Sequence, residues 1–198
     1  KDFLNGVSLI ENKKDDGNFF IINIGKKRSS LNFFDNYSFR YSQSFNFGSE
    51  IIAQDIARVC SLEQAFVKKI LEDEIYKEKI SNENEILEEK YFSHNNYKKI
   101  SKKLVYDVAN ARIEEICNII FKKNINILLF KRHNLNVYIH LKDQAVFQNL
   151  KKYFKYFLSK NNKLQINFIK HPKAIALVKK ASHLSTYGWN KEAVRRNC

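Results

Sequence analysis

Hydrophobic residues in the first third of the chain follow the patterns of β-strands. Phe19–Ile22 is a run of four apolar residues directly after a turn-forming stretch, and Leu31–Phe34 is a second run that ends at Asp35. From Tyr37 to Phe47 aromatic residues recur mostly at every second position. Three such segments separated by short polar turns predict a three-stranded antiparallel meander.

The spacing becomes helical after Gly48. Apolar residues recur every three or four positions from Ile52 to Cys60, and Ser49 is the predicted N-cap of this helix. Ser61 with Gln64 three residues later has the spacing of a capping box, which predicts a second helix from Ser61. The longest apolar stripe predicts a third helix over about 101–122, with a buried face that contains Leu104, Val105, Val108, Ala109, Arg112, Ile116, Cys117 and Ile120.

The remaining pattern alternates between strands and helices. Leu135–Leu141 and Leu164–Ile169 predict strands, whereas 127–130 fits a helix end or a strand equally well. Helices are expected around 147–157 and after Pro172, which suits a first helical turn. Residues 73–100 are charged and lack periodicity, so we expect a small excursion from the main core. The resulting order is that of a mixed α/β protein, a mixed sheet flanked by helices.

Composition and charge narrow the function classes. The chain has 198 residues, of which 44% are hydrophobic, and its 27 aromatic residues argue against disorder. Its net charge is +14, but the excess is regional: up to Ile120 there are 18 basic and 19 acidic residues, and from Phe121 onward 17 and 2. Of the basic residues 28 are Lys and seven are Arg, the residue that best reads phosphate and guanine. We therefore expect no nucleic acid partner, although a basic nucleic-acid-binding α/β domain stays an alternative.

Candidate catalytic and metal-binding patterns are weak. The cysteines, Cys60, Cys117 and Cys198, form no CxxC pair, and the five histidines form no HxxxH or HExxH pattern. The sequence also has no GxSxG motif and no P-loop. We therefore expect no metal site, no catalytic residues and no enzyme activity.

Four segments carry motifs that point to one known family. Phe19–Gly25 has the pattern of a strand that enters a phosphate loop, and Gly48–Ala57, with Ala65–Lys68 after it, is similar to Gly-x-x-(Ile/Val)-x-x-Asp-Ile-Ala followed by Ala-Glu-x-Ile-Lys. Val108–Ile116 contains Arg-x-x-Glu on a predicted helix, and Ala174–Leu177 is a short stretch near the end of the chain. In this order the segments resemble the second phosphate loop and the following motifs of the FtsA family of bacterial cell-division proteins, within the actin-like ATPase superfamily.

The resemblance implies an actin-like (ribonuclease H-like) ATPase lobe, the second of the two lobes of that fold. On this basis 1–72 form the first part of the lobe, 73–100 a small outer excursion, and 101–198 the remainder of the lobe with a closing helix. The first lobe would lie before Lys1. ATP is the implied cofactor, and the positions that match its binding residues are Gly25, Gly48, Ser49 and Lys68.

The two glycine-rich loops of the nucleotide site differ from the family pattern. Asn23 stands where the family has the Asp on the metal side, and Lys26, Lys27 and Arg28 replace the following glycines and Thr. The adenosine-side turn is replaced by 142–145, which contain no glycine. Close approach of a backbone to phosphate needs residues without a Cβ atom, so we expect ATP binding to be lost or weakened. The three cations either neutralise phosphates in place of Mg²⁺ or form a charged turn without a ligand.

The resemblance implies an adaptor that links FtsZ filaments to the membrane, so the chain would be cytoplasmic and peripheral at the division site. The C-terminal tail of FtsZ, other divisome proteins and self-association are the implied partners. Arg112 and Glu115 match the partner-binding helix, although an intrahelical salt bridge explains this pair equally well. The segment 188–196 contains too little apolar surface to anchor the chain alone. The alternative within the superfamily is a pilus-assembly adaptor or a chaperone-type lobe.

Overall fold

The structure is a computed structural model that describes residues 18–35, 38–73, 85–92, 97–124, 136–142, 151–159, 165–169 and 174–187. The strands in these ranges are β1 (Phe19–Ile24), β2 (Ser29–Asp35), β3 (Ser38–Phe45), β4 (Asn136–Leu141) and β5 (Gln165–Phe168). The helices are α2 (Ser49–Cys60), α3 (Gln64–Glu72), η2 (Glu89–Tyr91), α4 (Lys102–Cys117), η3 (Asn118–Lys122), α7 (Lys151–Ser159) and α8 (Ala174–Tyr187). The expected element at 127–130, Pro172 and the segment 188–196 lie outside the described residues.

The described strands form one mixed sheet in the order β3-β2-β1-β4-β5. β1, β2 and β3 pair antiparallel, which confirms the predicted meander, and β4 and β5 add parallel to β1 on its other side. The central strand β1 is buried along its whole length. Apart from Asn23 all its residues are apolar and they do not alternate with polar ones, as expected of a strand covered on both faces.

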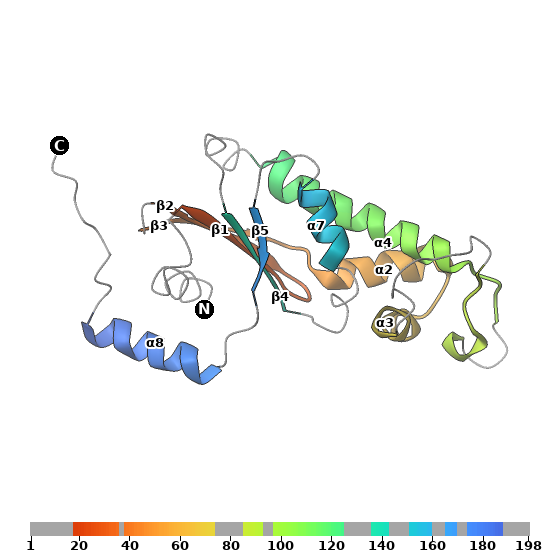
Figure 1. Ribbon diagram of the computed structural model, residues 1–198. Coiled ribbons are helices and arrows are strands. Elements are labelled where there is room, and N and C mark those ends of the chain that lie inside the picture. Colours follow the sequence, from red (N-terminus) through yellow and green to blue (C-terminus); the bar gives the residue numbers. More distant parts are fainter. Residues whose placement is uncertain are drawn as a thin grey trace.

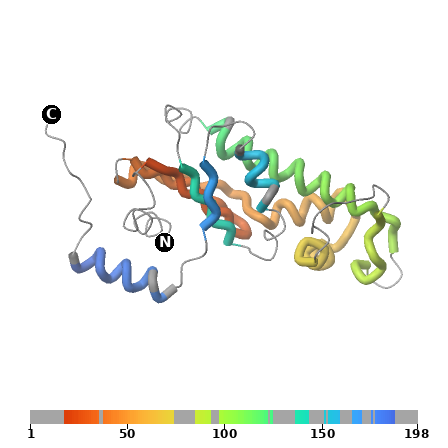
Figure 2. The backbone as a smooth tube through the Cα atoms, viewed as in Figure 1, coloured from red at the N-terminus to blue at the C-terminus, as the bar shows by residue number. Residues whose placement is uncertain are grey.

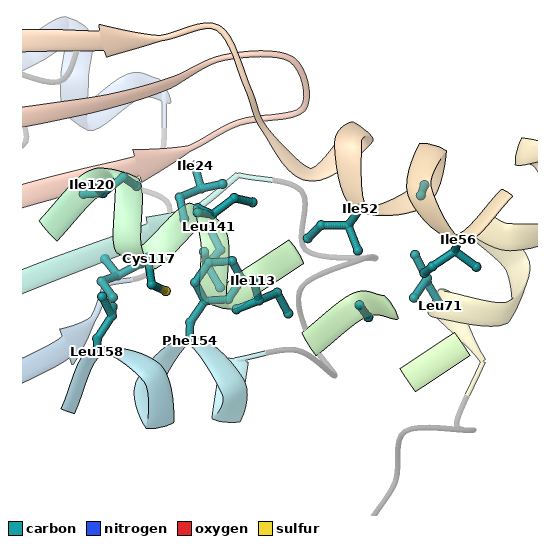
Figure 3. Packing of buried hydrophobic residues seen from close by; sticks show 14 of the residues in the cluster. Ile24, Ile52, Ile56, Leu71, Ile113, Cys117, Ile120, Leu141, Phe154 and Leu158 are labelled. Atoms are coloured by element: carbon teal, nitrogen blue, oxygen red, sulfur yellow. The ribbon is translucent and has the colours of Figure 1, made fainter. Parts of the chain in front are cut away.

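The larger core lies between one face of the sheet and helices α2, α4 and α7, and it continues between α2 and α3. Side chains of Phe20, Ile22 and Ile24 point to this face, and helix residues such as Ile52 and Ile113 pack against them. Figure 3 shows Ile24 and Leu141 of the sheet beside α4 and α7. Helices α2 and α4 run side by side and extend away from the sheet (Figure 2). The prediction of a mixed sheet flanked by helices is thus confirmed.

The opposite face carries a smaller apolar cluster made of Phe19, Ile21, Phe34 and Tyr138. Leu184 of α8 packs against it, so the last helix lies on the side of the sheet away from α2, α4 and α7 (Figure 1). Ile175 and Val178 of α8 stay exposed. This arrangement places two layers of helices on the two faces of one sheet.

Three helix boundaries differ from the sequence prediction. Gly48 and not Ser49 is the N-cap of α2, and Ser49 is its first helical residue. The capping-box pattern at Ser61 does not start a helix: Ser61 ends α2 in a left-handed conformation (φ 52°), and α3 begins at Gln64. The predicted helix over 101–122 is α-helical to Cys117 and then continues as the π-helix η3.

Two burial predictions also change. Leu104, expected on the buried stripe of α4, is 42% exposed, because the buried stripe consists of Val105, Ala109, Ile113, Ile116 and Cys117. In the expected excursion, Leu87, Tyr91 and Ile100 are buried in the larger core cluster. These three residues therefore pack onto the core, whereas the carboxylates Glu85, Glu88 and Glu89 are exposed.

Candidate nucleotide site

The turn between β1 and β2 rests on the first turn of α2. Gly25 N–H donates to the carbonyl oxygen of Arg28 (3.0 Å), which closes the turn. The carbonyl oxygens of Gly25 and Lys26 accept from the backbone N–H groups of Ser49 (2.9 Å) and Glu50 (3.0 Å). Figure 3 shows this turn beside the segment that leads into α2. The structure thus brings Gly25, Gly48 and Ser49 together.

Both positions at this contact need glycine, because there is no room for a Cβ atom. A Cβ atom on Gly48 would lie 2.3 Å from the carbonyl oxygen of Gly25 and 2.4 Å from that of Lys26. A Cβ atom on Gly25 would lie 2.7 Å from the carbonyl oxygen of Arg28. These are backbone atoms, so they cannot move aside cheaply. In this chain the glycines serve the contact between the chain's own turn and its own helix.

The start of a helix normally offers unbonded N–H groups to an anion. Here the N–H groups of Ser49 and Glu50 are already bonded to turn carbonyls. The expected anion site at Gly48 and Ser49 is therefore filled by the chain's own backbone, which sequence reasoning did not foresee. The signal that could have revealed it is the pairing of one glycine in the turn with one at the helix start.

Asn23, which the sequence resemblance matches to the metal-side Asp, is buried at 1% exposure. Its side-chain Oδ1 lies 3.0 Å from Nδ1 of His140, and its Nδ2 donates to Oγ of Ser30 (3.4 Å). Asn23 and His140 are register partners on the parallel strands β1 and β4. The amide is thus a member of a buried polar pair, which keeps it from solvent.

His140 was not among the residues predicted for the site. Its buried position at 1% exposure and its bond to Asn23 make it a neighbour of the turn. A polar residue at the same register in each of two apolar strands is the signal that identifies this pair. Lys142 follows on from β4, and its backbone N–H donates to the carbonyl oxygen of Ile24 (2.9 Å).

Lys68 lies on α3, beyond the C-terminal end of α2, whereas Gly48 and Ser49 begin that helix. The 12 residues of α2 span roughly 18 Å at a rise of 1.5 Å per residue. Among the described residues, no hydrogen bond or ion pair joins the half-buried Lys68 to the turn. In the described part of the chain no group of three or more His, Cys, Asp and Glu residues could hold a metal ion.

Arg112 and Glu115 lie on α4 and form the predicted ion pair between positions three apart. Arg112 also forms an ion pair with Asp55 of α2, the Asp of the Asp-Ile-Ala segment. The guanidinium and Asp55 are partly buried, at 26% and 18% exposure of their side chains, whereas Glu115 is 52% exposed. Arg112 thus joins two helices, a contact that helical spacing alone does not predict.

No protein-family model and no curated protein matches the sequence. Solved structures match it by fold. The ethanolamine utilization protein EutJ from Carboxydothermus hydrogenoformans is 12% identical with a TM-score of 0.52, over 83% of this chain and 48% of EutJ. The match to the PilM–PilN type IV pilus biogenesis complex has 11% sequence identity and a TM-score of 0.53, over 93% of this chain and 48% of the matched chain.

MreB5 of Spiroplasma citri, solved with AMPPNP, is 14% identical with a TM-score of 0.50, over 91% of this chain and 57% of MreB5. The chain spans about half the length of the structures that it matches. No helix among the described residues is long and apolar enough to cross a membrane. The sheet order, the flanking helices and these matches together show that the chain has the fold of an actin-like ATPase domain.

Proposed function

We propose that the chain is the lobe of an actin-like adaptor that works by binding partners and not by hydrolysing ATP. The observation that carries this proposal is the closed turn: the N–H groups of Ser49 and Glu50 that a phosphate would need are bonded to Gly25 and Lys26. In addition, the buried amide of Asn23 offers no carboxylate to a hydrated Mg²⁺ ion.

Within that class we propose an FtsA-like role, linking FtsZ filaments to the membrane at the division site. This role is supported by the sequence of Gly48–Ala57, which is similar to the FtsA motif, and by Arg112 and Glu115 of α4, which fit Arg-x-x-Glu. The exposed carboxylate of Glu115 sits at the outer end of the Asp55–Arg112–Glu115 network. A partner would thus meet a charged group whose position is fixed by contacts within the protein.

A pilus-assembly adaptor is the second candidate, favoured by the fold match to PilM in its complex with PilN. Both candidates share the mode of action, because each would bind a protein segment on an actin-like scaffold. They differ in the partner. Co-sedimentation with FtsZ filaments, with and without the C-terminal tail of FtsZ, separates them: tail-dependent pelleting supports the FtsA-like role, and no pelleting with either form argues against it.

The docking surface can be tested without disturbing the fold. Arg112→Ala is a poor probe, because it also breaks the contact between α2 and α4. Glu115→Ala removes the exposed carboxylate and its surface ion pair with Arg112 but keeps the contact of Arg112 with Asp55. It should weaken binding of an FtsZ tail peptide at least fivefold, since charged groups at an interface contribute about 1 kcal/mol or more.

The matched control for this variant is Glu114→Ala, which removes the neighbouring exposed carboxylate on the same helix. Peptide affinity is measured by fluorescence anisotropy, and circular dichroism verifies the helix content of each variant. Equal affinities for the wild type and both variants would place the docking surface elsewhere.

Loss of nucleotide binding has its own test. A ligand present at 100 times its Kd stabilises a protein by about 2.7 kcal/mol. We expect the melting temperature to be unchanged within about 1 °C in millimolar Mg-ATP, because the turn is closed. A rise of several degrees would contradict the proposal, and a rise that appears only without Mg²⁺ would assign Lys26, Lys27 and Arg28 to the phosphates.

A further inference from the structure

Three consecutive cations lie at the tip of the turn between β1 and β2. Lys26, Lys27 and Arg28 are all exposed, whereas the residues on either side, Gly25 and Ser29, are buried. Lys142, which follows β4, adds a fourth exposed cation near the turn: its Cδ lies 3.8 Å from the position of a Cβ on Gly25. Because β1 and β4 are parallel, this cluster lies where both strands have their C-terminal ends.

The base of this turn is held by several hydrogen bonds. Besides the bonds to α2 and the bond that closes the turn, Oγ of Ser29 donates to the carbonyl oxygen of Phe47 (2.7 Å). The backbone under the cations is therefore fixed before any ligand arrives. Preorganisation lowers the entropy cost of binding, so even a short partner segment can gain from this surface.

Carboxylates in the described part of the chain do not neutralise the tip. Glu50, on the first turn of α2, is the acidic residue bonded to the turn, and that bond uses its backbone N–H. In the described ranges no ion pair joins a carboxylate to Lys26, Lys27 or Arg28. The tip therefore keeps its three positive charges for an anionic partner.

The kind of anion follows from which donors remain. Compact phosphates are best held by several backbone N–H groups, and those of Ser49 and Glu50 are taken. What remains are side-chain cations spread along a short turn, which suit carboxylates spread along a peptide. We propose that the 26–28 turn docks an acidic segment of a partner protein, with Asp or Glu at two or more neighbouring positions.

This surface differs from the one around Glu115 and goes beyond the proposed function. It is tested with the triple variant Lys26→Ser, Lys27→Ser, Arg28→Ser and a fluorescein-labelled octaglutamate peptide as the probe. Because the chain carries a net charge of +14, an equal loss of charge elsewhere is the essential control. The variant Lys98→Ser, Lys99→Ser, Lys155→Ser removes three other exposed cations.

We expect the turn variant to lose about tenfold in affinity at low salt, since exposed ion pairs contribute roughly 0.2–1 kcal/mol each, and the control variant to stay within about twofold of the wild type. Melting curves verify that all three proteins are folded. Equal losses in the two variants would mean diffuse attraction to the whole basic surface, and absence of binding by the wild type would likewise overturn the proposal.

Competition with inorganic tripolyphosphate distinguishes the two kinds of anion. If tripolyphosphate displaces the peptide only at concentrations where other salts of equal ionic strength also do, the carboxylate assignment stands. If it displaces the peptide at far lower concentration, and loses this ability in the turn variant, the turn is a phosphate site and the proposal is wrong. Neither result depends on the affinity of an FtsZ tail for the Glu115 surface, so each proposal can fail separately.

Discussion

Asn23 shows how one residue can decide between a ligand site and a structural contact. At the position that the sequence resemblance matches to a carboxylate, this chain has an amide whose Oδ1 lies 3.0 Å from Nδ1 of His140 inside the sheet. A neutral amide and an imidazole can share a hydrogen bond without burying a charge, which would be costly. The amide of Asn23 therefore serves a contact between β1 and β4.

Replacing Asn23 by Leu should destabilise the protein by about 1–3 kcal/mol, the usual cost of removing a buried hydrogen-bond partner. The control Asn167→Leu changes an exposed Asn on β5 and should have an effect within about 0.5 kcal/mol. Urea unfolding of the three proteins measures the difference. Similar stabilities for wild type and Asn23→Leu would mean that the pair contributes nothing to the fold.

Tyr91 is a second residue whose chemistry depends on its surroundings. Burial, and then a hydrogen bond from its hydroxyl to Asp73, raise the pKa of Tyr91 from 10.0 to about 12. Between pH 10 and pH 12 the folded state therefore keeps the phenol proton of Tyr91, whereas the unfolded chain releases it. The stability that this proton provides is complete below pH 10 and is lost as the pH rises from 10 through 12.

The free energy of unfolding should therefore decrease with pH in this window, and less steeply in Tyr91→Phe, which has no proton to lose. Urea titrations at half-unit steps from pH 9.5 to 11.5 measure the slope. Tyr156→Phe, which changes a 53% exposed side chain on α7, serves as the control and should keep the wild-type slope. Identical slopes for wild type and Tyr91→Phe would contradict the pKa assignment.

At the scale of elements, α4 offers a matched test of which face is buried. Ile116 is 2% exposed and Leu104 is 42% exposed on the same helix. Ile116→Asp would bury an unpaired carboxylate and should cost several kcal/mol, a large share of the 5–15 kcal/mol that stabilises a typical domain. Leu104→Asp should cost less than about 1 kcal/mol. If the melting temperature decreased equally in both variants, α4 would not bury the face that contains Ile116.

The end of α2 offers a stabilising change. Ser61 has a left-handed conformation that costs a residue with a Cβ atom about 1–2 kcal/mol, and its backbone N–H bonds to the carbonyl of Ala57. Ser61→Gly should raise the free energy of unfolding by about 0.5–1 kcal/mol after the entropy cost of glycine in the unfolded chain. Ser61→Ala should change it by less than 0.5 kcal/mol. A Gly variant no more stable than the Ala variant would contradict this.

Most elements could be predicted from the sequence, because each buries a stripe or an alternating face. The exact ends of the helices were harder to predict. Ser61 fits a capping box and also a helix end, and local spacing cannot choose between them. Likewise the placement of Leu104 depends on which of two adjacent stripes meets the sheet.

For the whole molecule, the resemblance of motif order led to the fold, and the fold matches support it at the level of actin-like domains. The candidate site was only partly accessible from sequence. The absence of glycines from the expected phosphate loops is visible in the sequence. The closure of the turn onto α2, by contrast, joins residues 25 and 49, and the Asn23–His140 bond joins residues that are 117 positions apart. Contacts between distant positions leave no periodic signal, so only the structure reveals them.

The parallel pairing of β1 with β4 also has a consequence for how the chain reaches this fold. β1 is the centre of the sheet, yet one of its edges stays open until residues 136–141 have been synthesised. Until then Phe19–Ile22, apolar on both faces, has no partner on that edge, which is the exposure that favours aggregation and chaperone capture. Closing so large a loop is slow, so folding should wait for the last third of the chain. The basic charge concentrated after Phe121 would arrive together with the strand that completes the sheet.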